Sequence, residues 1–157
     1  PLGAAKAQKI ALVDMEYILK KDPSYAVMNR QIEDLSKKWQ AEVAGYEKKA
    51  EQAYQSYQSE AALLSAQQKK QREESIVALE KQAYELKRKY FGPEGELFKK
   101  RESLMKPIQD RVWAAMKELA RRGGLQLIID RTSSKIVYAD PGLDISEAVV
   151  STLGLDR

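Results

Sequence analysis

A hydrophobic repeat with the period of a coiled coil is the feature that most constrains this chain. Asp22 and Pro23 form a helix-start signal, after which an apolar or aromatic residue recurs about every 3.5 residues. These positions are Tyr25, Met28, Ile32, Leu35, Trp39, Val43, Tyr46, Ala50, Ala53, Tyr57, Ala61 and Leu64. A straight helix of this length would measure about 60 Å, more than the diameter of a small domain. We therefore expect a long helix that projects from the rest of the fold.

The repeat resumes after a turn signal, which predicts a second, antiparallel helix. Ser65 and Gln68 have capping-box spacing, so a tight turn is expected near residues 63–66. The apolar positions then continue at Ile76, Leu79, Ala83, Leu86 and Tyr90. Residues 91–95 contain one proline and two glycines and predict a kink, and Gly123 with Gly124 predicts the end of the helix. Residues 22–122 are thus expected to form a helical hairpin arm.

Short apolar segments on either side of the arm predict a small β-body. Residues 9–14, 125–130 and 135–140 have strand character, the last two as a hairpin. Residues 144–147 have capping-box spacing and predict a short final helix that turns Ala148, Val149 and Leu153 toward the core. The fold class is therefore α+β: a long antiparallel helical hairpin inserted in a β-body of residues 9–21 and 123–157. So small a core implies that the body oligomerises.

Residues 1–8 are expected to be a disordered N-terminal segment. Residues 1–3 look like a remnant of a cloning tag, and residues 5–7 (Ala-Lys-Ala) have the small-x-small form of a signal-peptidase site. Chance explains so short a match about as well.

The residue inventory argues against catalysis. The chain has no cysteine and no histidine, which excludes disulfides, cysteine nucleophiles and histidine-based triads. Neither a Gly-rich phosphate loop nor a metal-ligand cluster is found, so we predict no enzyme activity, cofactor or metal. Asp14, Asp130 and Asp140 each follow a predicted strand and are interpreted as turn residues. The net charge is +4, but basic residues alternate with glutamates along the chain, which argues against nucleic-acid binding.

Motifs at both ends of the chain resemble the Skp/OmpH family. They are residues 9–19 (Lys-Ile-Ala-Leu-Val-Asp-Met-Glu-Tyr-Ile-Leu), Pro107, Ile108, Val112, Gly124, residues 129–130, residues 137–141 (Val-Tyr-Ala-Asp-Pro) and residues 144–146. The resemblance implies a periplasmic, ATP-independent chaperone that binds unfolded outer-membrane proteins and prevents their aggregation. It also implies a homotrimer, in which strands of three chains form a central body and three hairpins surround a cavity as tentacles. The residues expected in the trimer body are Ile10, Leu12, Leu127, Ile129, Ile136 and Tyr138.

Aromatic and apolar residues of the arm are the candidates for client contact. They are Tyr46, Tyr54, Tyr57, Leu63, Leu64 and Tyr84. A chaperone that works without nucleotide needs weak, exchangeable contacts, and tyrosine offers flat apolar area with a hydroxyl that tolerates water. Tyrosines on the 3.5-residue repeat can equally hold the two helices together, so Tyr54, which lies off the repeat, is the better candidate.

A basic cluster lies close to the predicted turn. Lys69, Lys70 and Arg72 could meet anionic membrane lipid, lipopolysaccharide or an acidic client, or could simply keep the turn soluble.

Two other functions remain open on sequence grounds. A structural coiled-coil scaffold of the cell envelope would need the same heptads but no strands that close a body. A cytosolic prefoldin-like chaperone would place its strands between the two helices, whereas here they lie outside the hairpin. The order of the elements therefore disfavours the second.

Overall fold

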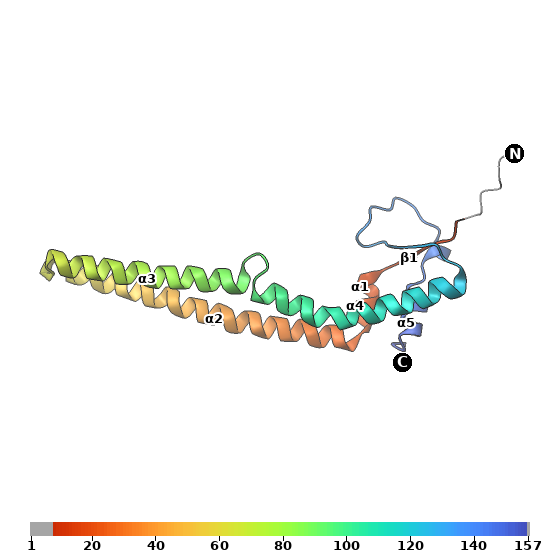
Figure 1. Ribbon diagram of the computed structural model, residues 1–157, viewed down its shortest axis with the longest axis horizontal. Helices are drawn as coiled ribbons and strands as arrows, with labels where there is room; N and C mark the ends of the chain where they lie inside the picture. Colours follow the sequence, from red (N-terminus) through yellow and green to blue (C-terminus); the bar gives the residue numbers. More distant parts are fainter. Residues whose placement is uncertain (1–7, 157) are drawn as a thin grey trace. The chain divides into compact units, whose positions relative to one another are not determined.

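The computed structural model describes residues 8–156 and divides into two compact units (Figure 1). The arm unit is Arg30–Glu102, and the body unit comprises the described residues before and after it. Both boundaries expected from the sequence, at residues 22 and 122, lie within the body unit. The N-terminal segment 1–8 falls, except for Gln8, outside the described residues. No helix within residues 8–156 is both long enough and apolar enough to cross a membrane.

The arm unit is the predicted helical hairpin. It is formed by most of α2 (Pro23–Glu60), the 3₁₀ turn η1 (Ala61–Leu63), α3 (Ala66–Phe91) and the first residues of α4, which begins at Glu96, and α2 and α3 run side by side in Figure 1. The capping box is present: the Gln68 amide donates to Ser65 Oγ at 3.1 Å, and the Ser65 amide donates to Gln68 Oε1 at 2.9 Å. The turn and the capping box predicted from the sequence are thus confirmed.

An apolar seam between α2 and α3 holds the arm together. Every predicted repeat position within the arm is buried or half-buried, and Val43, Ala50, Ile76 and Ala83 are only 5 to 7 % exposed. Nearer the end of α3, the rings of Trp39 and Tyr90 stack with their centroids 4.5 Å apart. The coiled-coil period therefore identifies the packed face correctly.

A four-residue loop separates α3 from α4 (Glu96–Gly123), so the kink expected at residues 91–95 is a complete break. The Gly92 amide donates to the Arg88 carbonyl at 2.8 Å, and Glu94 has a φ of 56°. A Cβ on Gly92 would collide with the Arg88 carbonyl oxygen. The chain therefore needs a glycine at the residue that ends α3.

The body unit contains a two-stranded parallel sheet. β1 (Ile10–Val13) pairs with β2 (Leu127–Asp130), with Ile10 opposite Leu127 and Val13 opposite Asp130. These are two of the three predicted strands. Since β1 and β2 run parallel, the whole chain between them serves as the crossover connection.

The prediction of a third strand at residues 135–140 is wrong, because these residues form no strand. The predicted hairpin with residues 125–130 is therefore wrong as well. Side chains hold the residues just before this segment in a turn, because Asp130 Oδ1 accepts hydrogen bonds from the Thr132 amide at 3.0 Å and the Thr132 hydroxyl at 2.7 Å. The following apolar residues find no cover within one chain: Val137 is 94 % and Tyr138 is 83 % exposed. The other neighbour of β1 is residue Asp144, bridged to Leu12.

Helices rather than strands make most of the body core. Val13 packs with Ile18 of α1 (Met15–Lys21), Val112 and Ala115 of α4, and Val149 of α5 (Ser146–Thr152). The sequence analysis did not anticipate α1, which is capped by Asp14 accepting a hydrogen bond from the Tyr17 amide at 3.0 Å. The predicted β-body is thus a mixed body in which helices cover a minimal sheet.

The predicted final helix exists, but two of its details are wrong. Its N-cap is Ile145, without a side-chain cap, because the Asp144 carboxylate accepts from the Ser146 amide at 2.8 Å instead of forming a capping box. Ala148 is exposed, whereas Val150 is buried. A helix of two turns that starts one residue later presents a rotated face to the core.

A buried carboxylate ties two helices of the body together. Asp22 accepts from the Ser24 amide at 2.8 Å at the start of α2, and its other oxygen receives the Arg111 guanidinium of α4 at 2.9 Å. The Asp22 side chain is 6 % exposed, so nearly all of its hydrogen bonding is with the protein. The predicted helix start at Pro23 therefore also has a tertiary role.

Substituting the glycine at the helix break should destabilise the arm. We expect Gly92→Ala to lower the free energy of unfolding by about 1–3 kcal/mol, since a backbone carbonyl must move to admit the methyl group. The matched control is Gly45→Ala inside α2, where an added Cβ meets nothing within 4 Å, and it should stabilise the chain by about 0.5–1 kcal/mol. Urea unfolding followed by helical circular dichroism measures both. Equal effects of the two variants would contradict the assigned role of Gly92.

Candidate functional site

Two exposed tyrosines of the arm share one groove between α2 and α3, here called the tyrosine groove. It has a volume of about 410 Å³ and is lined by Glu47, Ala50, Glu51, Tyr54, Glu80, Ala83, Tyr84 and Lys87. Tyr54 is 48 % and Tyr84 is 65 % exposed, while the two alanines of the seam are each 6 % exposed. Because the alanines are small and buried, room remains above them for a guest side chain that would contact the tyrosines.

The remaining client candidates lie elsewhere on the arm. Tyr46 lines a smaller groove with Leu86, and Tyr57 is half-buried on the seam, where its hydroxyl donates to Glu73 at 2.6 Å. Leu64 is half-buried beside the turn, whereas Leu63 within η1 is 87 % exposed. The structure thus brings Tyr54 and Tyr84 together, leaves Leu63 separate, and places the other three where they pack the hairpin.

The basic cluster at the turn is partly neutralised within the chain. Arg72 forms an ion pair with Glu60 across the turn, whereas Lys70 is exposed and Lys69 is half-buried. Only the two lysines therefore offer charge to an outside partner without first breaking that pair.

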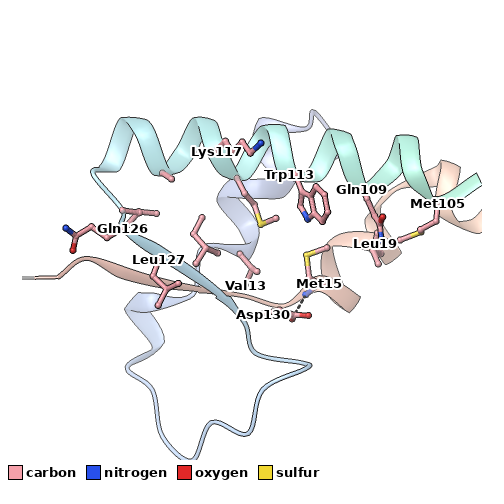
Figure 2. Close-up of a pocket in the computed structure, with 14 residues that line it drawn as sticks. Val13, Met15, Leu19, Met105, Gln109, Trp113, Lys117, Gln126, Leu127 and Asp130 are labelled. Atoms are coloured by element: carbon pink, nitrogen blue, oxygen red, sulfur yellow. Dashed lines mark hydrogen bonds between the residues drawn. The ribbon is translucent and has the colours of Figure 1, made fainter. Parts of the chain in front are cut away.

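The body unit carries a larger apolar pocket, here called the methionine pocket, which the sequence analysis missed (Figure 2). It has a volume of about 640 Å³ and is lined by Val13, Met15, Leu19, Met105, Gln109, Trp113, Met116, Lys117, Ala120, Leu125, Gln126, Leu127, Ile128 and Asp130. Figure 2 shows α1, α4 and both strands contributing side chains to this space. Since its residues come from two stretches of the chain that lie far apart in sequence, 13–19 and 105–130, no local pattern could reveal it.

One residue of the pocket did carry a sequence signal. Trp113 follows Val112 of the core stripe but faces outward, and it is 52 % exposed. Large aromatic residues with one open face are typical of surfaces that bind another protein, and the methionines beside it can adapt to varied shapes. An outward tryptophan next to the repeat could therefore have been singled out.

The predicted trimer-body residues differ in their exposure within one chain. Leu12 is 4 % exposed and already buried in its own body, while Ile10 and Ile129 are half-buried. Leu127 is 49 %, Ile136 is 36 % and Tyr138 is 83 % exposed. The last three are the most exposed of the set.

Of the three carboxylates predicted as turn residues, Asp130 follows β2 and holds a turn, whereas Asp14 caps α1 and Asp140 caps the 3₁₀ helix η2 (Pro141–Leu143) after a segment that is not a strand. Asp130 Oδ1 also accepts from the Met15 amide at 3.4 Å, a bond drawn in Figure 2, and Asp140 accepts from the Gly142 amide at 2.7 Å. Burial alone would raise the pKa of Asp130, but hydrogen bonds from Thr132 and Met15 outweigh it and hold that pKa below 3.8. Burial is likewise outweighed at Asp144, where Ser146 and Arg131 lower the pKa.

These lowered pKa values predict that the body loses stability in acid. Because both carboxyls have a lower pKa when folded, the stabilisation present above their unfolded pKa is lost as the pH falls through their folded pKa. We expect the free energy of unfolding to decrease as the pH is lowered beyond about 4. Asp130→Asn should flatten this slope. Urea titrations across the acid range test it, and an unchanged slope in the variant would show that Asp130 is not responsible.

Comparisons with known proteins agree with one another. The family model described as outer membrane protein (OmpH-like) matches residues 9–153. The chaperone protein Skp of Yersinia enterocolitica is 25 % identical over 150 residues, which cover 94 % of this chain and 87 % of that protein. The crystal structure of an OmpH-like protein from Caulobacter crescentus CB15 has a similar fold, with a TM-score of 0.72 at 11 % identity over 96 % of this chain and 86 % of that one.

Proposed function

Because the chain belongs to the OmpH-like family, we propose that it is an ATP-independent holdase chaperone of the periplasm. It would bind unfolded outer-membrane proteins and keep them from aggregating. The observation that carries this proposal is the tyrosine groove, where two exposed aromatic side chains line one space together with two small, buried alanines of a helical pair. The similarity to a protein named as a chaperone supports the same role.

The chemistry of the arm suits binding that is reversible without an energy source. Each tyrosine ring contributes apolar contact area, and its hydroxyl remains compatible with water when no client is bound. Leu63 and Val77 add separate exposed apolar contacts, at 87 % and 60 % exposure. Several weak contacts together give useful affinity, while each one exchanges rapidly. Lys69 and Lys70 could in addition attract anionic lipid, lipopolysaccharide or an acidic client to the turn.

We further propose that the body assembles as a homotrimer through surfaces that one chain leaves uncovered. β2 pairs only with β1 among the described residues, so its other edge can accept a strand. The apolar segment containing Val137 and Tyr138 is exposed and could supply it from a neighbouring chain. The same neighbour would cover the adjacent methionine pocket and Trp113.

The holdase function is tested by diluting a urea-denatured β-barrel membrane protein into the purified chain without nucleotide. We expect turbidity to stay low and the light-scattering mass to rise as client binds. Replacing Tyr54 and Tyr84 together by serine should weaken protection severalfold, because both rings of the groove are removed. Phe98→Ser is the matched control, since Phe98 is 49 % exposed on the same unit but lies outside the groove. If the wild-type chain left the client to aggregate, a structural scaffold would be the better interpretation.

Assembly is tested by placing a charge on the uncovered segment. We expect Val137→Asp to convert a mass of about three chains into that of one, because a buried unpaired carboxylate opposes association. Leu63→Asp is the control, because Leu63 is similarly exposed but lies in the turn of the arm. The mass of this variant should stay at about three chains. Multi-angle light scattering at fixed protein concentration measures both. A Val137→Asp chain that kept the wild-type mass would refute a contact at this segment.

A further inference from the structure

The tyrosine groove has a charged rim of defined arrangement. Glu47, Glu51 and Tyr54 follow one another at spacings of four and three on α2, and Glu80, Tyr84 and Lys87 do so on α3. Residues at these spacings share one face of a helix. Because the two helices run antiparallel, Glu80 lies toward the Tyr54 end of the groove and Lys87 toward the Glu47 end.

The carboxylates of this rim are not neutralised by the chain. Elsewhere on the arm Lys37 pairs with Glu33 at 3.0 Å, and Arg72 pairs with Glu60. Among the described residues, none of the three groove glutamates has an ion-pair partner within 4 Å. Three carboxylates and one ammonium therefore give the groove an excess of negative charge, on a chain whose net charge is +4.

The ring of Tyr54 is held in place beside these carboxylates. Its hydroxyl accepts a hydrogen bond from Gln58 Nε2 at 2.9 Å, one helical turn away. A fixed aromatic face next to a carboxylate suits arginine and lysine, whose alkyl stems pack on the ring while the cationic group reaches the negative charge. A guest with negative charge next to its apolar side chain would meet repulsion there.

We propose that the tyrosine groove selects client segments in which an aromatic or aliphatic side chain lies next to arginine or lysine. The inference rests on the proposed chaperone function and names the class of segment that this groove takes. The apolar side chain occupies the space above Ala50 and Ala83, and the neighbouring cation lies against Glu51 or Glu80.

Three fluorescent peptides with one apolar core, flanked by arginine, glutamine or glutamate, test the selection on the full chain by fluorescence anisotropy. We expect the arginine peptide to bind about tenfold more tightly than the glutamate peptide, since Glu51 and Glu80 each contribute about threefold in affinity. Added salt should reduce this difference. Combining Glu51→Gln with Glu80→Gln should remove most of the preference and leave the glutamine peptide unaffected. Tyr84→Ser should weaken all three peptides.

Glu33→Gln combined with Glu85→Gln is the control for net charge, because it also removes two carboxylates from the arm, and both lie outside the groove, near Lys37 and Lys81. It should keep the wild-type preference. Equal binding of the arginine and glutamate peptides, or a preference that survives the double substitution, would overturn the inference. So would a wild-type chain that binds none of the peptides. In each of these cases the aggregation assay decides separately whether the chain is a holdase.

Discussion

The apolar seam between α2 and α3 is the interaction on which the arm depends. A stripe of residues at coiled-coil spacing turns toward the partner helix, and the side chains on either side of it remain in water. Where the stripe carries Ala50 opposite Ala83, it closes the helix pair without filling the space beside it. The tyrosine groove therefore results from using small residues in a seam that elsewhere contains valine, isoleucine and stacked aromatic rings.

The body differs from the arm because it leaves large apolar side chains exposed within one chain. Its core of Val13, Ile18 and Val149 is fully closed, yet Trp113 and Tyr138 remain exposed. A small body with so much apolar surface in water would be prone to nonspecific association unless a defined partner covered it. This exposed apolar surface is the physical reason for the proposed assembly of identical chains.

Local signals explain which parts of the fold were predictable. The seam and the capping box of Ser65 depend on residues close together in sequence, and these predictions are confirmed; the predicted kink at residues 91–95 was located correctly but is a complete break. The error at residues 135–140 has a different origin, because strand propensity there is satisfied only if a partner strand is present. The methionine pocket and the parallel pairing of β1 with β2 are tertiary features that periodicity does not contain. For the candidate site, exposed Tyr54 was identified from its position off the repeat, but its shared groove with Tyr84 required the register of two helices.

The parallel pairing of Ile10 with Leu127 has a consequence for how the chain acquires its structure. The contacts of the arm join residues near one another along the chain, so they can form early and quickly. The sheet joins residues 10–13 to residues 127–130, and a disordered connection between them would carry a high entropic cost of closure. A hairpin that has already formed replaces this flexible connection with a short one. The arm would thus assist the folding of its own body before it meets any other polypeptide.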